Sequence, residues 1–328
     1  MTMPPSRRLE FSEVPVVDIG PLVKGGPTHA RDTVAALAKA CNEVGFIQVI
    51  NHGVPRDALE RLIDEAARFF AQPLEERLKV AIENSPQFRG YLPLKYKGEI
   101  DEGDNLQEAF IIFHERPLSD TCPMYGPNQW PQGMPGFKRA MLDYFVVVEQ
   151  LARAMLPGFA AALELSHDFF APLFNDSMMM LKLNHYPAQD APEHVKEIGV
   201  VGHSDSGAFT ILWQDDVGGL EILNKSGEWV VVPPIRGAYV INLGNIMQIW
   251  TNGRFSSTPH RVINRYGRDR YSIPLFVNPN YETVVKPLFG DAPADFTPFI
   301  SGDYQRSVYR RIYPQRPSLA LNATPAGQ

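Results

Sequence analysis

Residues 202–214 read Gly-His-Ser-Asp-Ser-Gly-Ala-Phe-Thr-Ile-Leu-Trp-Gln, a polar turn that leads into a short β-rich run. Similar runs recur before and after it, at Met178–Tyr186, Gly207–Gln214, Leu220–Leu223, Trp229–Val232, Tyr239–Leu243, Arg261–Asn264 and Tyr271–Val277. Turn residues separate these runs, and strands at this spacing predict a sandwich or barrel. Because the runs lack connecting helices of the length that parallel βαβ units need, a Rossmann or TIM-type sheet is disfavoured.

The first half of the chain is mainly helical by its pattern of apolar residues. Helices are predicted at about Arg31–Glu43, which Gly45 ends, at Asp57–Ala71, and after Pro135, where Pro157 predicts a kink or break. The other expected segments are a buried strand at Phe46–Ile50, irregular strands and loops over Ser85–Gln132, a final helix at Ser301–Ile312 and a loose tail over Pro314–Gln328. Long loops of this kind often border a pocket.

The composition is that of a globular protein without a cationic surface. Among 328 residues, 31 Lys and Arg face 37 Asp and Glu, a net charge of −6, so we expect no nucleic-acid partner. No apolar run approaches the roughly 18 to 20 residues of a membrane helix, and the first ten residues are polar, which predicts no membrane association and a cytoplasmic protein. The two cysteines, Cys41 and Cys122, are too few for a disulfide scaffold, and we expect both to be reduced.

The strongest chemical signal is the spacing of His203 and Asp205. In an extended chain alternate side chains share a side, so this imidazole and this carboxylate converge while Ser204 points away. With His260 as a third donor, the set becomes the 2-His-1-carboxylate arrangement that holds non-haem Fe(II) and leaves coordination positions open. Taken alone, a His-x-Asp is also compatible with a surface turn pair, and His260 with an ordinary half-buried histidine.

Two further polar pairs lie on predicted strands. Alternation places Arg270 and Ser272 on one face, where a guanidinium fork and a hydroxyl can bind a carboxylate. Asn184 and Tyr186 likewise share a face, and His185 faces the other way. The structural alternatives are a rim ion pair for Arg270 and a Tyr186 hydroxyl satisfied by a backbone carbonyl.

Other common catalytic signatures are absent from the sequence. His114-Glu115 is not followed by the second histidine of a zinc-protease helix, and the chain has neither a Gly-x-Ser-x-Gly elbow nor a glycine-rich phosphate loop. Hydrolase and dinucleotide-binding functions are therefore disfavoured.

The motifs together resemble those of the isopenicillin N synthase-like family of Fe(II)/2-oxoglutarate-dependent oxygenases. The matching segments, in the family's order, are Val14–Ile19, Gly45–Pro55, Asn184-His185-Tyr186-Pro187, His203-Ser204-Asp205, Ser257–Val262 and Arg270-Tyr271-Ser272. The resemblance spans most of the chain. It implies a mixed α/β, β-rich fold whose core is a double-stranded β-helix, a cupin-like jelly roll, wrapped by N-terminal helices.

The resemblance also implies an activity and a division of the chain. Iron would lie on His203, Asp205 and His260; Arg270 and Ser272 would bind the distal carboxylate of 2-oxoglutarate, with Tyr186 assisting and Asn184 nearby. The enzyme would use O2, with ascorbate as a candidate reductant, to form succinate and CO2 while it oxidises a small molecule, by default through hydroxylation. We expect an N-terminal region (1–135), a long helix (136–177), the binding core (178–285) and a C-terminal segment (286–328), in one compact unit.

The sequence does not identify the substrate, although three residues are candidates for its pocket. Arg89 resembles a position where some relatives hold a substrate carboxylate, with a surface arginine as the alternative. Glu108 and Phe110 are expected to line the same pocket. Two departures from the family are the histidine at 185, where an aromatic is common, and the segment Ala191–Glu197, which alters the expected pocket edge.

Three alternative functions follow from the same residues. One is an oxidase similar to isopenicillin N synthase that needs no keto acid, and another is an ethylene-forming variant. The third is a noncatalytic protein that holds a metal or small ligand. In each case the expected partner is a small molecule, and no obligate protein partner is evident.

Overall fold

Two β-sheets form the centre of the protein, whose computed structural model describes residues 12–94, 106–119, 122–188, 198–264 and 267–312. In spatial order, the larger sheet contains β1 (Val16–Asp18), β2 (Phe46–Ile50), β10 (Tyr239–Leu243), β7 (Phe209–Gln214), β12 (Arg270–Val277), β5 (Met180–Tyr186), β4 (Glu108–Phe113) and β3 (Gly90–Leu92). The smaller sheet contains β6 (Ile198–His203), β11 (His260–Ile263), β8 (Leu220–Leu223) and β9 (Trp229–Val231). A separate short ladder pairs β13 (Val284–Val285) with β14 (Phe299–Ile300).

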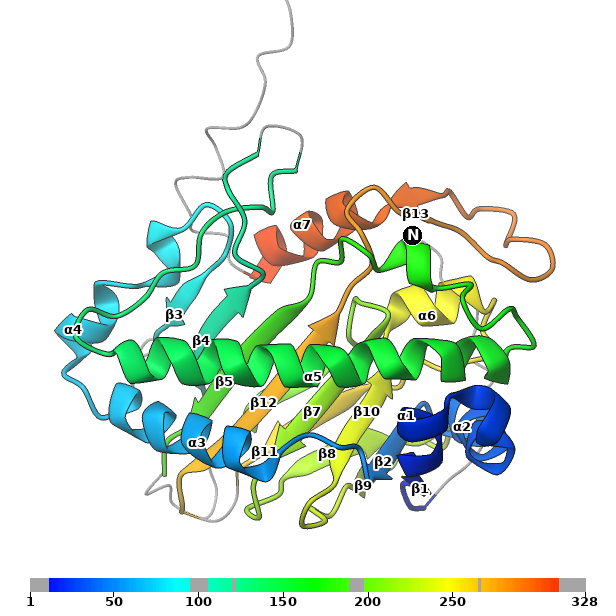
Figure 1. The fold of residues 1–328 in the computed structure, drawn as a ribbon, viewed down its shortest axis with the longest axis horizontal. Coiled ribbons are helices and arrows are strands. Elements are labelled where there is room, and N and C mark those ends of the chain that lie inside the picture. Colours follow the sequence, from blue (N-terminus) through cyan, green and yellow to red (C-terminus); the bar gives the residue numbers. More distant parts are fainter. Residues whose placement is uncertain (1–11, 95–105, 120–121, 189–197, 265–266, 313–328) are drawn as a thin grey trace, which may run out of the picture.

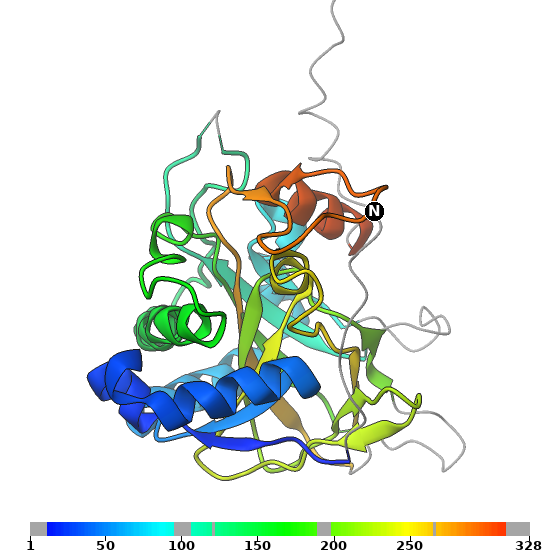
Figure 2. The same ribbon diagram turned by 90° about the vertical axis from the view of Figure 1, so that its right-hand side faces the viewer.

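Helices cover one face of the larger sheet (Figure 1). The helices of the described chain are α1 (Gly20–Gly25), α2 (Arg31–Glu43), α3 (Arg56–Phe70), α4 (Leu74–Leu78), α5 (Pro135–Ala162), α6 (Asn245–Trp250) and α7 (Ser301–Ile312), with 3-10 turns at Pro27–His29, Ile82–Asn84 and Ala171–Leu173. Of these, α5 runs across the strands, with α2 and α3 beside it. Figure 2 shows α2 and α5 on one side of the larger sheet and the strands of the smaller sheet on the other.

The alternation of side chains gives the larger sheet two different faces. On β5, Leu181 and Leu183 belong to the core beneath the helices, whereas Lys182, Asn184 and Tyr186 point toward the smaller sheet. Apolar residues of both sheets pack in the space between them. This pair of facing, mostly antiparallel sheets is the predicted double-stranded β-helix, with the predicted helices around it.

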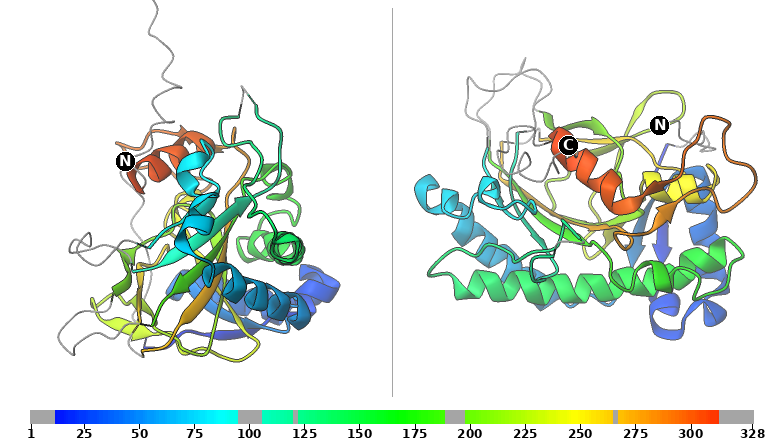
Figure 3. Two further views of the ribbon diagram at one scale, coloured as in Figure 1. Left: turned by 90° about the vertical axis from the view of Figure 1, so that its left-hand side faces the viewer. Right: turned by 90° about the horizontal axis from the view of Figure 1, so that it is seen from above.

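The last described helix, α7, lies on the side of the larger sheet opposite α5 (Figure 3). Its Tyr309 packs in a second apolar cluster with Phe88 and Phe113. Its Gln305 accepts a hydrogen bond from Ser206, at 2.8 Å. The helix thus supports the turn that carries His203 and Asp205.

The helix α5 differs from the sequence-based expectation in two respects. Pro157 lies inside it and does not end it, since the helix continues to Ala162. By length and hydropathy α5 is also apolar enough to cross a membrane, contrary to the expectation that no run comes close. In this fold, 56% of its most apolar 18-residue window is buried inside the protein, which is the environment of a core helix lying on a sheet.

Most predicted elements are present, with their ends shifted by at most one or two residues. The predicted runs at Leu220–Leu223 and Tyr239–Leu243 match β8 and β10. The strand β6 and the short helix α6 are among the elements that were not predicted. In β6 two glycines and His203 hide the alternating signal, and α6 is only six residues long, too short to show a helical period. The expected tail at Pro314–Gln328 lies outside the described residues.

Candidate metal centre

His203, Asp205 and His260 converge from two adjacent strands of the smaller sheet. His203 ends β6, Asp205 follows in the next turn, and His260 begins β11. The two strands pair antiparallel with His260 opposite His203. Strand pairing therefore brings the distant histidine to the His-x-Asp turn.

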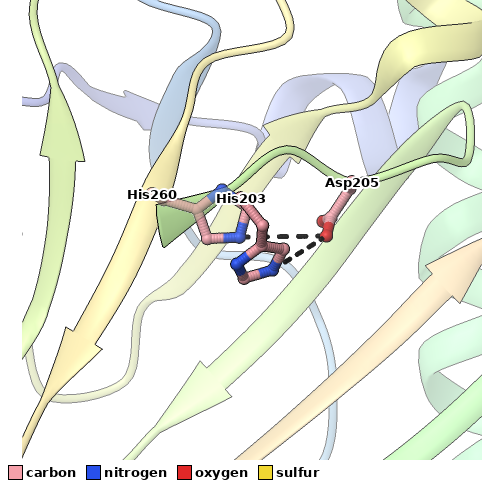
Figure 4. Close-up of side chains that lie close together, drawn as sticks. All are labelled: His203, Asp205 and His260. Carbon is pink, nitrogen blue, oxygen red and sulfur yellow. Dashed lines mark ion pairs between the residues drawn. The ribbon is translucent and has the colours of Figure 1, made fainter. Parts of the chain in front are cut away.

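The three side chains turn toward a common point (Figure 4). The Nε2 atoms of His203 and His260 lie 3.7 and 3.8 Å from Oδ1 of Asp205. The potential ligand atoms of all three residues lie within 4.8 Å of one another. Donor atoms this close together can contact one ion.

Backbone carbonyls fix the tautomer of both imidazoles. Nδ1 of His203 lies 2.9 Å from the carbonyl oxygen of Val201, and Nδ1 of His260 lies 3.3 Å from that of Thr258. Because a carbonyl can only accept, each Nδ1 carries the proton and donates it. Each Nε2 then presents its lone pair toward Asp205, as a metal ligand requires.

The carboxylate of Asp205 is held by one oxygen and offers the other. Its Oδ2 accepts hydrogen bonds from the hydroxyl of Thr210, at 2.5 Å, and from Nδ2 of Asn242, at 2.6 Å. Oδ1 faces the two histidines. The neighbouring strands β7 and β10 therefore orient the carboxylate while they leave its second oxygen available.

The protonation states suit metal binding. Burial lowers the pKa of His260 to about 4, with a further contribution from His203, so its imidazole is neutral near pH 7. Burial raises the pKa of Asp205, but the two histidines and the hydrogen bonds from Thr210 and Asn242 outweigh burial and hold it below its ordinary value. Two imidazoles and one carboxylate are the donor set that fits Fe(II) with open coordination positions.

A cavity of about 80 Å³ lies beside these three residues and is named the site cavity below. It lies between the two sheets and contacts all of the side chains that the sequence assigned to iron and 2-oxoglutarate. On the side of the larger sheet, the cavity is lined by residues of β5 and β12 and by the residue that precedes β4. These are Lys182, Asn184, Tyr186, Arg270, Ser272 and Gln107.

Arg270 is a buried cation in the wall of the site cavity, with an exposed fraction of 0%. Its Nε donates to the carbonyl oxygen of Gly218 at 2.5 Å, and its Nη2 donates to Oε1 of Gln214 at 3.2 Å. Within the described residues, Nη1 has no hydrogen-bond partner. Asp215 attracts the guanidinium electrostatically, but it accepts hydrogen bonds from backbone amides and does not line the cavity. The free guanidinium edge therefore favours an anionic ligand, because an unsatisfied buried charge costs free energy.

The other predicted cosubstrate residues surround Arg270. The ring of Tyr186 lies against the guanidinium, with its centroid 4.7 Å from Cζ. Asn184 donates from Nδ2 to the hydroxyl oxygen of Ser272 at 3.2 Å, which leaves the hydroxyl proton free to be donated. Oδ1 of Asn184 has no partner among the described residues. The donors fit the distal carboxylate of 2-oxoglutarate.

The prediction that His185 points away from this site is confirmed. Its Nδ1 lies 2.8 Å from Oε1 of Glu108, and its ring stacks on Tyr271 at 4.8 Å between centroids. The departure from an aromatic residue at position 185 thus places an imidazole in a polar cluster behind the site cavity.

Arg89 is neither a surface residue nor part of the site cavity. Its exposed fraction is 1%, which contradicts the surface alternative. The guanidinium donates to Asn128 Oδ1 and to the carbonyl oxygens of Gln87, Met124 and His114. Because every nitrogen is bonded to protein oxygens, the side chain holds loops together at this end of the fold. Burial lowers the pKa of Arg89 to about 10.

Glu108 and Phe110 were expected at the pocket but lie on the opposite face of β4. Glu108 binds His185 and pairs with Arg77, and Phe110 packs against Phe69 beneath the helices. Gln107, one position earlier, lines the site cavity instead. A shift of one residue along a strand moves a side chain to the other face, and β4 carries no motif that could fix its phase.

Lys182 is the charged residue that the sequence-based prediction missed. It lines the site cavity two positions before Asn184, on the same face of β5. Burial lowers the pKa of its ammonium to about 8, against an opposing effect of Asp205. The alternation that identified Asn184 and Tyr186 would also have found it. The segment Ala191–Glu197 lies outside the described residues.

Comparison with known protein families gives two matches that together span most of the chain. Residues 177–279 match the 2OG-Fe(II) oxygenase superfamily. Residues 14–133 match the N-terminal region named for the non-haem dioxygenase in morphine synthesis.

Curated relatives and solved structures are similar over nearly their whole length. The chain is 35% identical over 317 residues to the 2-oxoglutarate-Fe(II) type oxidoreductase hxnY of Emericella nidulans, covering 91% of this chain and 90% of that protein. It is 37% identical over 303 residues to the homoarginine-6-hydroxylase 2-ODD-C23 of Glycine max, covering 85% and 89%. A full-length Neurospora crassa protein in complex with alpha-KG superposes with a TM-score of 0.80 at 26% identity, covering 94% and 100%. That protein has also been solved with alpha-KG and thymine.

Proposed function

Because the chain belongs to the 2OG-Fe(II) oxygenase superfamily and is a non-haem Fe(II)- and 2-oxoglutarate-dependent dioxygenase of the hydroxylase type, we propose specific roles for its residues. His203, Asp205 and His260 hold the iron. Arg270 and Ser272 bind 2-oxoglutarate, with Tyr186 and Asn184 beside them. The substrate is a small organic molecule, a class to which the thymine in the Neurospora crassa complex belongs.

The observation that carries the iron assignment is the convergence of Nε2, Nε2 and Oδ1. Both Nδ1 atoms and the second carboxylate oxygen are already engaged by the protein. The three remaining donor atoms thus face one another with no other described partner, and they are the right kinds of atom for Fe(II).

Different residues of the chain have different roles in the reaction. When bound, the iron supplies O2 activation, coupled to the conversion of 2-oxoglutarate into succinate and CO2. Arg270 and Ser272 fix one end of the cosubstrate by two-point contact, so that its keto-acid end is directed toward the histidines. The two sheets bury Asp205, His260 and Arg270, whereas the side chain of His203 is 40% exposed.

In an oxidase that needs no keto acid, Arg270 would have to bind something other than 2-oxoglutarate. In the described residues the Nη1 atom of this buried guanidinium has no partner, which supports a carboxylate ligand there. Neither the ethylene-forming variant nor a noncatalytic binding protein is favoured by a particular contact.

Succinate formation tests the proposal directly. The purified protein is loaded anaerobically with Fe(II) and 2-oxoglutarate, O2 is admitted, and succinate, CO2 and headspace ethylene are measured. We expect O2-dependent succinate without ethylene, and loss of both iron binding and turnover in Asp205→Ala. Asp216→Ala, a change at an acidic residue with an 89% exposed side chain, is the matched control. Intact iron binding with no consumption of 2-oxoglutarate would favour the oxidase.

We also infer a cytoplasmic enzyme. Cys41 and Cys122 are free and buried in the structure, which suits a reducing compartment. Ascorbate as an auxiliary reductant is a further proposal, which the succinate measurement tests when ascorbate is omitted.

A further inference from the structure

Lys182 places a second cation in the site cavity, and the assigned reaction does not use it. It lies on β5 opposite Ile111 of β4. The register of β5 with β12 continues on both sides of it and places Pro274 across from it on the other flank. The stem of the side chain therefore rises between apolar neighbours, and its ammonium lies in the cavity wall.

Within the described residues, this ammonium has no hydrogen-bond partner and no ion pair. Its electrostatic attraction is to Asp205. That carboxylate is already bound through Oδ2 to Thr210 and Asn242, and its Oδ1 faces the histidines. Lys182 is therefore not accounted for as a structural counter-ion.

Among the described residues, the charges that line the site cavity do not balance without another anion. In this part of the chain its cations are Lys182 and Arg270, its carboxylate is Asp205, and its histidines are His203 and His260. Ferrous iron adds two positive charges and the 2-oxoglutarate dianion removes two. One positive charge then remains between the two sheets, beside the buried Asp205 and Arg270, where an unpaired charge costs free energy.

Lys182 is separated from the position assigned to the distal carboxylate. Arg270 pairs across the ladder with Tyr186, four residues further along β5. At about 3.3 Å per residue this is roughly 13 Å along the strand. The two cations thus enter the cavity at different points, and Arg270 already has Ser272 as a second donor nearby.

From this charge imbalance we propose that the oxidised substrate carries a negatively charged group, most simply a carboxylate, which pairs with Lys182. The proposal rests on the proposed oxygenase function and adds the chemical class of the substrate. The point charge of Lys182 anchors the anion, and this contact positions the rest of the molecule beside the three metal-binding side chains.

Fractionated metabolites provide a test that does not require the identity of the substrate. A small-molecule extract is split on an anion exchanger, and each fraction is incubated with the iron-loaded enzyme, 2-oxoglutarate and O2. We expect wild type to consume a compound of the retained fraction, and methyl esterification of that fraction to abolish its consumption. Consumption only from the unretained fraction overturns the proposal.

Variants at position 182 test whether consumption of the retained compound depends on Lys182. Lys182→Met should reduce consumption of the retained compound at least tenfold through a raised KM, and Lys182→Arg should restore part of it. Lys225→Met, in an exposed turn, should behave as wild type. Unchanged KM in Lys182→Met overturns the proposal.

Binding measurements separate this proposal from the function on which it rests. Calorimetric titration under anaerobic conditions should give the same affinities for Fe(II) and 2-oxoglutarate in Lys182→Met and wild type. Weakened 2-oxoglutarate binding in the variant would assign Lys182 to the cosubstrate and overturn the proposal. Failure of wild type to bind 2-oxoglutarate would instead refute the oxygenase function.

Discussion

His185 and Glu108 form a buried pair, 2.8 Å between Nδ1 and Oε1, directly behind the strand positions that line the site cavity. Arg77 pairs with the other oxygen of the same carboxylate, and Tyr91 donates to it. The cluster ties β4 to β5 on the helix-covered face. It therefore acts on the position of the strand that carries Lys182, Asn184 and Tyr186.

Replacing Glu108 by Gln should destabilise the fold without removing the metal site. The change leaves Arg77 partly buried and unpaired, so the free energy of unfolding should fall by about 3 kcal/mol. Urea denaturation measures this change. Glu60→Gln, in an ion pair whose side chains are 71% and 55% exposed, should cost less than about 0.5 kcal/mol. Equal effects of the two changes would contradict the structural role of the cluster.

Thr210→Val should weaken metal binding. The substitution keeps the volume of the side chain and removes one of the two hydrogen bonds that hold Oδ2 of Asp205. We expect the dissociation constant for Fe(II) to rise about 10- to 100-fold. Thr33→Val, the control, removes a part-buried hydroxyl hydrogen bond to the backbone of Asp18, far from the site. If both variants bind iron like wild type, Thr210 does not orient the ligand.

Arg270→Lys should raise the dissociation constant for 2-oxoglutarate while iron affinity stays unchanged. A lysine ammonium cannot reproduce the planar fork, and loss of one charge-assisted hydrogen bond corresponds to about 10- to 100-fold in affinity. Arg261→Lys alters an arginine on β11 of the smaller sheet that pairs with Glu221, and it serves as the control. Equal 2-oxoglutarate affinity in wild type and Arg270→Lys would contradict the assignment.

The burial of Lys182 predicts a pH-dependent cost in stability. Its pKa falls from 10.5 in the unfolded chain to about 8 in the fold. Between these values the unfolded chain binds more protons, so the free energy of unfolding rises with pH across the window. Lys182→Met should therefore stabilise the metal-free protein below pH 8, by about 3 kcal/mol, with the gain vanishing toward pH 10.5. A pH-independent difference in thermal unfolding would refute this.

Gly45→Ala should disturb the approach to His260. Gly45 has φ of +74°, and a Cβ there would lie 2.1 Å from the carbonyl oxygen of Ser256 and 2.8 Å from Oγ1 of Thr258. We expect a loss of about 3 kcal/mol or more in unfolding free energy and weaker iron binding. Gly227→Ala, at φ of +85° with open space around it, should cost about 1 kcal/mol and spare the metal. Similar costs at both sites would contradict the close approach.

The sequence was informative wherever the period of a strand could be anchored to a recognisable motif. On β5 and β12, alternation correctly grouped Asn184 with Tyr186 and Arg270 with Ser272, and it turned His185 away. On β4 there was no such motif, and the sequence-based prediction assigned Glu108 to the pocket. In the structure the neighbouring Gln107 lines the site cavity instead. The prediction for Arg89 was wrong for another reason. Its hydrogen-bond acceptors come from several loops that are not adjacent in sequence, so the sequence does not reveal that the side chain is buried.

The sequence by itself determined which side chains share a face within a strand, because that depends only on the two-residue repeat of an extended backbone. It also determined the chemical types of the metal-binding side chains, which are two imidazoles and one carboxylate. Tertiary structure alone decided which face looks into the cavity, that His260 stands opposite His203, and that the Lys182 ammonium has no partner among the described residues. These properties arise from the pairing and packing of distant segments, which no local period specifies.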